Sequence, residues 1–306
     1  MYKPFGIVEI GSTNTKAYVC SEKEIIEIGF KTIEFKKNYA LAGCIISSDT
    51  DALVRYVNGV FDNGIDIYVY ATSVFRELKE EDVRRFEQTL KKETSVKSVN
   101  IVTAKTENEL TVIGAMNNVS LDDDVCVFVG GGGSTEISVC RNGKIIEMVN
   151  SDIGVTSIMR TFPDLSENYA STDIETVTKH IYKYLKLPAH KSDYMILAGG
   201  DYILRYENAK YPVNKNTLFS SEDHPYIIPT QENRAFEDKY YHKISLNELK
   251  GSTPDNPNWW NGTRSMCAFT NAVAVAIDAK IIIPTRISMV YGIASQLREK
   301  IYFMYD

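Results

Sequence analysis

Short apolar runs alternate with segments of helical periodicity along this chain. In the first third, the pattern predicts a strand at residues 65–71, a charged amphipathic helix at 74–92 and another strand at 96–102. Two strands joined by a helix usually pair in parallel, so this order predicts an α/β unit. A second series has a strand pair at 127–139 and strands at 194–198 and 281–283, with helices at 173–185, 264–279 and 292–304. Residues 205–262 show weak periodicity, and no element is predicted there.

Residues 127–139 predict a β-hairpin with an unusual turn. Three apolar residues lead into four consecutive glycines, then Ser134, Thr135 and Glu136, then an alternating strand. Glycine loses more backbone freedom on folding than any other residue, so four in a row are costly to order. The absence of Cβ atoms lets backbone N–H groups approach a ligand, and phosphate oxygens accept from such groups. A phosphate loop and a glycine-rich structural loop both fit this pattern.

A second copy of this pattern lies near the N-terminus. Residues 7–19 have an apolar strand with one acidic residue, a Gly-Ser turn, small polar side chains and a returning strand. Superposing Gly11 on Gly131 gives a separation of 120 residues, about the size of one domain. We therefore expect two similarly folded lobes, each presenting a polar loop to a phosphate chain.

Length and charge narrow the class of protein. A chain of 306 residues suits two domains, and its net charge of −6 with a pI near 5.4 predicts no general attraction to nucleic acid or anionic membranes. The N-terminus lacks the apolar segment of a signal peptide, and Asp278 and Lys280 interrupt the most apolar stretch. Five unpatterned cysteines favour reduced, buried thiols, so a cytoplasmic location is expected.

Two further features admit more than one interpretation. Glu107 is expected in the first turn of a helix that Thr106 caps, where it could serve a ligand site or stabilise the helix dipole. Trp259 and Trp260 could stack a base, but apolar plugs are commoner, and we favour the plug. The four histidines have no ligand spacing, so histidine-based metal chemistry is not expected.

Six segments together carry a family resemblance. They lie at residues 9–16, 71–76, 102–107, 131–136, 153–156 and 198–200. Their order and spacing resemble the exopolyphosphatase and guanosine pentaphosphate phosphohydrolase family, in the superfamily of sugar kinases, heat-shock chaperone ATPases and actin. The resemblance covers residues 5–204 well. It implies an α/β fold of two ribonuclease-H-like, actin-like ATPase lobes with a cleft between them, predicted at 1–122 and 123–290, with a closing helix at about 291–306.

The resemblance also implies roles for particular residues. Glu107 matches the family's catalytic glutamate, which orients or deprotonates the attacking water, and Arg76 clamps the anion. Glu9 and Glu136 are the expected ligands of Mg²⁺ or Mn²⁺. The expected phosphate contacts come from the two hairpins and one strand end, at Gly11, Ser12, Thr13, Lys16, Thr72, Gly131, Gly132, Gly133, Ser134 and Thr135.

Some residues depart from the family pattern. Glu9 stands where the family usually has Asp, and Val129 stands where it has the Asp of the second loop. Valine cannot bind a cation or accept a proton, so metal binding at that loop would depend on Glu136. Asp201 stands where the family has a threonine, and it could return a negative charge to the cleft.

The resemblance implies a hydrolase that releases terminal phosphate from inorganic polyphosphate or guanosine polyphosphate. Two alternatives stay open. A pseudoenzyme that senses phosphate chains or nucleotides is motivated by Val129, and a kinase or ATPase would share the superfamily fold. A homodimer is a common default for such folds.

Overall fold

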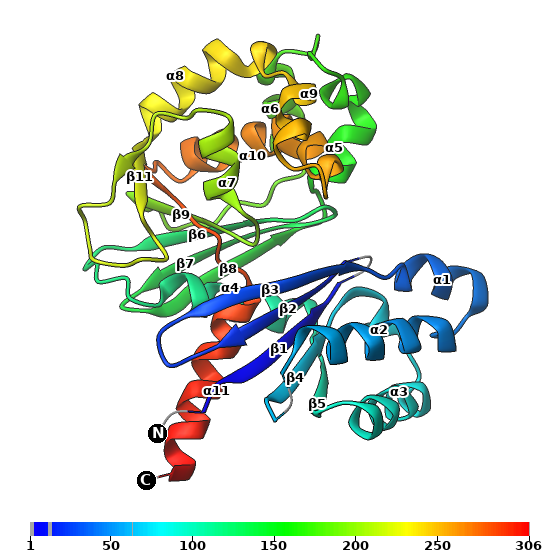
Figure 1. Cartoon of the computed structure of the whole chain (residues 1–306). Helices are drawn as coiled ribbons and strands as arrows, with labels where there is room; N and C mark the ends of the chain where they lie inside the picture. Colours follow the sequence, from blue (N-terminus) through cyan, green and yellow to red (C-terminus); the bar gives the residue numbers. More distant parts are fainter. Residues whose placement is uncertain (1–2, 12–13, 63, 306) are drawn as a thin grey trace. The chain divides into compact units, whose positions relative to one another are not determined.

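The computed structural model, described here for residues 3–11, 14–62 and 64–305, contains two compact units (Figure 1). One comprises Met1–Leu110 with Val290–Asp306, and the other comprises Thr111–Met289. These units are defined by how compactly the chain packs and do not test the predicted domain bounds at 1–122 and 123–290, which stay a prediction. None of the helices in the described part of the chain has the length and apolarity needed to cross a membrane.

The first unit is built on a five-stranded sheet of order β3-β2-β1-β4-β5. Strands β1 (Phe5–Ile10), β2 (Asn14–Cys20) and β3 (Ile25–Thr32) pair antiparallel, while β4 (Asp66–Ala71) and β5 (Val96–Ile101) continue in parallel from β1. Its helices are α1 (Phe35–Ala42), α2 (Ser47–Val60), η1 (Ser73–Glu77), α3 (Glu80–Glu93), α4 (Ala104–Met116), whose second half is counted with the other unit, and α11 (Met289–Tyr305).

The core of the first unit lies between the sheet and its helices. Phe75, from η1, makes edge or tilted contacts with Phe35 and Phe86 at centroid distances of 5.0 and 5.2 Å. Gly292 of α11 lies so close to Leu110 of α4 that a Cβ would overlap the Leu110 carbonyl. This glycine therefore allows two helix backbones to touch, and it joins the last helix of the chain to the first unit.

The predicted helix at 74–92 is wrong in one respect, because η1 and α3 are separate elements. Ser73 has a φ of 54°, in the left-handed region, so the chain turns sharply where β4 ends. The predicted cap of α4 is also wrong. Thr103 caps this helix, and its Oγ1 accepts from the Thr106 N–H at 3.1 Å.

The second unit has a seven-stranded sheet of order β10-β11-β12-β9-β6-β7-β8. Its strands are β6 (Val125–Gly130), β7 (Thr135–Arg141), β8 (Lys144–Ser151), β9 (Tyr194–Ala198), β10 (Asn214–Lys215), β11 (Tyr226–Pro229) and β12 (Ile281–Pro284). Its helices are α5 (Val155–Thr161), η2 (Pro163–Ser166), α6 (Ile174–Tyr182), α7 (Tyr202–Asn208), α8 (Thr230–Tyr240), η3 (Tyr241–Lys243), α9 (Leu246–Ser252), η4 (Pro257–Gly262) and α10 (Thr263–Ala276).

The same strand order recurs in both units. Strands β8-β7-β6-β9-β12 repeat the order β3-β2-β1-β4-β5, with three antiparallel strands followed by two parallel ones. This is the ribonuclease-H-like arrangement, so the predicted fold class of two such α/β lobes is confirmed. Strands β10 and β11 extend the second sheet and come from the stretch that the sequence left unassigned.

A buried arginine joins that stretch to the rest of the second unit. Arg264, in the first turn of α10, is completely buried, and its guanidinium donates to five backbone carbonyls. The acceptors are Tyr241 (3.3 Å), Leu165 (3.0 Å), Glu167 (2.8 Å), Asn168 (2.7 Å) and Ile244. The loop regions at residues 165–168 and 241–244 thus bind the same guanidinium. Burial lowers the pKa of Arg264.

Candidate functional site

The two predicted hairpins have the same turn geometry. In the first unit, the Gly11 N–H donates to the Asn14 carbonyl at 2.9 Å; in the second, the Gly131 N–H donates to the Ser134 carbonyl at 2.9 Å. The strand register matches as well, because Ile10 pairs with Thr15 as Gly130 pairs with Thr135. The 120-residue repeat inferred from the sequence is therefore confirmed. Ser12 and Thr13 lie outside the described residues.

The glycine loop of the second unit rests on the start of α5. The carbonyls of Gly131 and Gly132 accept from the N–H groups of Val155 (3.0 Å) and Thr156 (2.7 Å). Gly154 permits this approach, since a Cβ there would come within 2.6 Å of the Gly131 oxygen. Gly132 and Gly133 are exposed. The carbonyls thus fix the loop, and its exposed glycines are the part that a ligand can reach.

Two threonines of the predicted phosphate set hold the backbone around these turns. The buried Thr135 hydroxyl donates to the Ile153 carbonyl at 2.7 Å. Thr72, at the end of β4, donates to the Ile10 carbonyl through its N–H at 2.9 Å and through its hydroxyl at 3.4 Å. Both side chains therefore shape the loops, and direct phosphate contacts from them stay a prediction.

The structure brings the two predicted catalytic residues into direct contact. Nη2 of Arg76, on η1, forms an ion pair with Oε2 of Glu107, in the first turn of α4. The Arg76 Nε also donates to the Val102 carbonyl at 2.7 Å, which anchors the guanidinium at the end of β5. Their side chains are 31% and 38% exposed, so a ligand can reach both.

Glu9 contributes a second carboxylate in the same unit. Its Oε2 accepts from the Tyr18 hydroxyl at 3.3 Å. Burial raises the pKa of Glu9; the charge of Lys16 opposes this shift, and that of Glu107 adds to it. Lys16 faces Glu9 across the strands but forms an ion pair with Glu27 at 3.0 Å.

The Glu9 and Glu107 carboxylates suit a hard cation. Mg²⁺ is usually held by one or two carboxylates together with substrate phosphates. Over the described residues, no group of three or more histidine, cysteine, aspartate or glutamate side chains is placed to hold a metal. The oxygen chemistry therefore fits Mg²⁺ or Mn²⁺ only with ligands added by a substrate.

The corresponding position in the second unit is apolar. Val129 pairs with Glu136 across β6 and β7, as Glu9 pairs with Lys16 across β1 and β2. The valine side chain fills the space beside Gly199, whose φ is 83° and whose Cβ would lie 2.7 Å from Val129 Cγ1. Glu136, only 5% exposed, places the acid of this hairpin on the returning strand instead.

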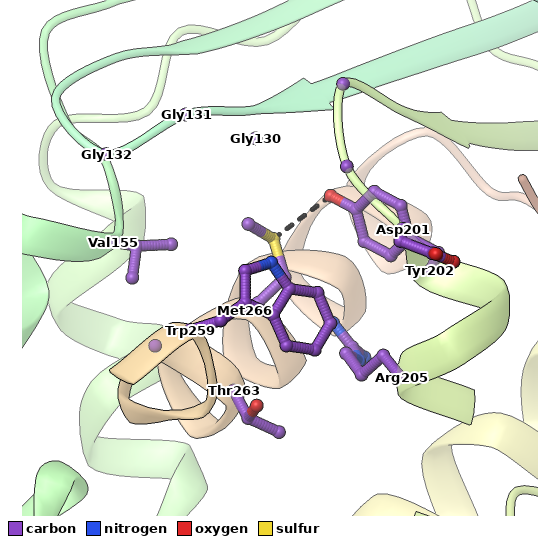
Figure 2. Close-up of a pocket in the computed structure, with 13 residues that line it drawn as sticks. Gly130, Gly131, Gly132, Val155, Asp201, Tyr202, Arg205, Trp259, Thr263 and Met266 are labelled. Carbon is purple, nitrogen blue, oxygen red and sulfur yellow. Dashed lines mark hydrogen bonds between the residues drawn. The ribbon is translucent and has the colours of Figure 1, made fainter. Parts of the chain in front are cut away.

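Beside the glycine loop lies a pocket of about 260 Å³ that sequence analysis missed (Figure 2). Trp260 is the buried plug that the sequence suggested, in a cluster with Ile244, Leu246 and Leu249. Trp259 is 37% exposed and lines the pocket. Its other lining residues are Gly130, Gly131, Gly132, Val155, Gly199, Gly200, Asp201, Tyr202, Arg205, Gly262, Thr263 and Met266. The Gly199–Gly200 pair before Asp201 is the sequence signal that could have revealed it.

Arg205 is the cation of this pocket. It is 2% exposed, and its Nη2 pairs with Oε1 of the fully buried Glu237 at 3.5 Å. Its guanidinium also lies 5.0–5.7 Å from the ring centroids of Tyr202, Tyr206 and Tyr211. Burial raises the pKa of Glu237 to about 7 despite the arginine. A charged pair thus stands behind a pocket whose other residues are mostly apolar or glycine.

Comparisons with known proteins agree with this fold. The family model of the Ppx/GppA phosphatase family matches residues 31–250. The type II variant of the Aquifex aeolicus Ppx/GppA phosphatase is 16% identical with a TM-score of 0.73, covering 96% of this chain and 99% of that one. Another Aquifex aeolicus family member is 15% identical with a TM-score of 0.71, covering all of both chains.

A Cytophaga hutchinsonii exopolyphosphatase is 12% identical with a TM-score of 0.69 over 97% of this chain and 98% of that one. A search of curated proteins finds no match. At these identities the solved structures show the fold alone, whereas the family model covers well over half of the chain. The chain belongs to the Ppx/GppA phosphatase family.

Proposed function

We propose that this protein is a phosphoanhydride hydrolase that releases terminal phosphate from inorganic polyphosphate or guanosine pentaphosphate. Family membership supports phosphatase-type chemistry. The observation that carries the proposal is the contact between Arg76 and Glu107, with the Glu9 carboxylate close enough for its pKa to respond to Glu107. Phosphoryl transfer requires charge neutralisation and a positioned water more than covalent chemistry.

The Arg76–Glu107 pair suggests how the site responds to substrate. A phosphate group competes with Glu107 for the guanidinium, because both present anionic oxygens that accept from the same N–H donors. When Arg76 turns to the phosphate, the Glu107 carboxylate becomes available to accept a proton from the attacking water. The hydrogen bond from Arg76 Nε to Val102 holds the side chain near both positions.

Glu9 is the residue we assign to the metal. Bound Mg²⁺ or Mn²⁺ would neutralise charge on the phosphate oxygens. Burial raises the pKa of Glu9 and disfavours its charged form although Lys16 opposes the shift, so a bound cation and this carboxylate would stabilise each other. Within the second unit, the exposed Gly132 and Gly133 are assigned to phosphate oxygens.

Phosphate release from tripolyphosphate and guanosine pentaphosphate, with Mg²⁺ or Mn²⁺, tests the proposal. We expect Glu107→Gln to lower kcat by about 10²- to 10⁴-fold, the usual contribution of a general base. Glu109→Gln is the matched control, since Glu109 lies on the same helix and, among the residues that the structure describes, pairs only with the exposed Lys105 at 3.7 Å. The proposal is lost if the wild type releases no phosphate from either substrate, or if both variants behave alike.

Val129 favours a second candidate function, a sensor that binds phosphate chains without efficient turnover. The valine is packed against Gly199, so the apolar residue is part of the second unit's fold. Such a protein would bind tripolyphosphate in calorimetry while releasing phosphate no faster than its Glu107→Gln variant.

A further inference from the structure

Three side chains on neighbouring strands lie beside the Glu9 carboxylate in the first unit. Across β1 and β2, Glu9 pairs with Lys16, and across β2 and β3, Tyr18 pairs with Glu27. Paired residues share a face of the sheet, as do residues two apart along one strand, so all four side chains project from the same face. The strand pairing therefore gathers two acids, one cation and one phenol.

An extra residue in β3 brings Glu27 to Tyr18. Ala17 pairs with Gly29, whereas the next residue, Tyr18, pairs with Glu27. Ile28 lies between those two partners and pairs with no residue of β2. Without this bulge Tyr18 would face Ile28. Bulges re-aim single side chains and are common next to active sites, and here the bulge gives Tyr18 a carboxylate as its neighbour.

The Tyr18 hydroxyl is a donor placed between two carboxylates. Tyr18 is only 6% exposed, and its hydroxyl donates to Oε2 of Glu9 at 3.3 Å. Burial raises the pKa of Tyr18, and the charges of Glu9 and Glu27, with hydrogen bonds to both, raise it further. The hydroxyl therefore keeps its single proton and can donate it to one carboxylate at a time.

Lys16 favours Glu9 as the acceptor. The Nζ atom of Lys16 forms an ion pair with Oε2 of Glu27 at 3.0 Å, which offsets the Glu27 charge. An acceptor whose charge is offset competes less well for the phenol proton, so the proton stays with Glu9. The bond is long for a hydroxyl donor, and such bonds in unliganded sites often shorten when a ligand binds.

Glu9 has a long side chain that must be fixed before it can hold a cation well. Glutamate has one more side-chain torsion than aspartate, so its carboxylate loses more rotamer freedom when it is held in one orientation. A hydrogen bond at Oε2 removes that freedom and leaves Oε1 for the cation. Carboxylate ligands of metals are usually fixed by such partners, whose loss lowers metal affinity by about 10- to 100-fold.

We propose that Tyr18 is the positioning residue of Glu9, holding Oε2 so that the carboxylate presents Oε1 to a divalent cation. The inference rests on the proposed function, which assigns Glu9 to the metal. In this assignment Tyr18 touches neither the cation nor the substrate and acts only through Glu9.

Mn²⁺ binding to the full chain tests this role without turnover. Electron paramagnetic resonance measures free Mn²⁺ in the presence of inorganic phosphate, which offers further oxygen ligands. We expect Tyr18→Phe, which keeps the buried ring, to bind Mn²⁺ about tenfold more weakly than the wild type. Tyr56→Phe is the matched control and should bind Mn²⁺ as the wild type does, because its hydroxyl is also buried in the first unit but has no partner among the described residues.

Glu9→Asp tests the same contact from the other partner. Aspartate is shorter by one methylene group and should not reach the Tyr18 hydroxyl. We expect Glu9→Asp to weaken Mn²⁺ binding about tenfold, and adding Tyr18→Phe to it should cost almost nothing more, because the contact is already lost. If Tyr18→Phe does not fold, Glu9→Asp decides alone, and an affinity equal to that of the wild type overturns the inference.

Kinetics separate positioning from a general defect of the fold. Tyr18→Phe should raise the Mn²⁺ concentration for half-maximal phosphate release about tenfold and change kcat at saturating Mn²⁺ by less than about twofold. A defect that removes folded protein would lower kcat and leave the Mn²⁺ dependence unchanged.

Equal Mn²⁺ affinities of the wild type and folded Tyr18→Phe would overturn the inference, as would an equal loss in Tyr56→Phe or a wild type that binds no Mn²⁺. These results are separate from turnover. A loss confined to Tyr18→Phe, in a protein that releases no phosphate, supports the positioning role and contradicts the hydrolase. Phosphate release with an unchanged Mn²⁺ affinity in Tyr18→Phe supports the hydrolase and removes the positioning role.

Discussion

Replacing Val129 with aspartate introduces the acid that the family resemblance implies before the second glycine loop. Residue 129 lies directly opposite Glu136, and side chains in such pairs have Cβ atoms about 5 Å apart. Two unit charges at that distance repel by about 3 kcal/mol at an effective dielectric constant of about 20. Loss of the half-buried isopropyl group costs about 1 kcal/mol more. We therefore expect Val129→Asp to lower the free energy of unfolding by about 4 kcal/mol.

Thermal unfolding measures this change. For a unit of this size, about 4 kcal/mol corresponds to a Tm lower by about 10 °C. Val129→Asn is the matched control, because it has the same shape without the charge and should cost only about 1 kcal/mol. Mg²⁺ at a hundred times its Kd should restore about 2.7 kcal/mol to the aspartate variant and nothing to the asparagine variant.

Two outcomes would refute this reasoning. If both variants unfold at the same temperature without Mg²⁺, the charge at residue 129 is not opposed by Glu136. If Mg²⁺ stabilises neither, the two carboxylates do not form a cation site. Phosphate release by Val129→Asp separates the two candidate functions. A large gain identifies the wild type as a degenerate enzyme, and a loss shows that the native site works with valine.

Three further predictions concern the second unit and the cysteines. Arg264→Lys should lower the free energy of unfolding by about 3 kcal/mol, because buried carbonyls lose their donors. Chemical denaturation measures this loss. The control, Arg160→Lys, changes an exposed residue and should alter the free energy of unfolding by less than about 0.5 kcal/mol. The pKa of Glu237 rises from 4.5 unfolded to about 7 folded, so its contribution to stability is complete below pH 4.5 and declines as pH rises through 7. The loss amounts to about 3 kcal/mol, and Glu237→Gln should remove this slope from unfolding measured across pH. A thiol reagent should react rapidly with Cys44 alone in the native protein, because the other four cysteines are buried. Cys44→Ser should abolish this rapid reaction. Rapid reaction of a second thiol would contradict the burial of the other four.

Local chemistry was enough to predict much of each unit. The glycine turns at Gly11 and Gly131 and the alternating strands around them are set by neighbouring residues, and the observed register confirms their 120-residue repeat. The five thiols are free as expected, although Cys44 is exposed. Glu107 lies in the first turn of α4, where the helical periodicity placed it. The split between η1 and α3 was missed, because the break falls at Leu78 and Lys79, which are extended but are neither glycine nor proline.

Only the tertiary structure decided which side chains meet. It paired Arg76 with Glu107, buried Trp260 but left Trp259 on a pocket wall, and placed Arg205 against Glu237 across 32 residues of sequence without clear periodicity. Outside residues 205–262, the sequence by itself determined most strands, turns and helices, because backbone sterics and hydrophobic period act between near neighbours. The pocket and its cation depended on packing between distant segments, which no local pattern encodes.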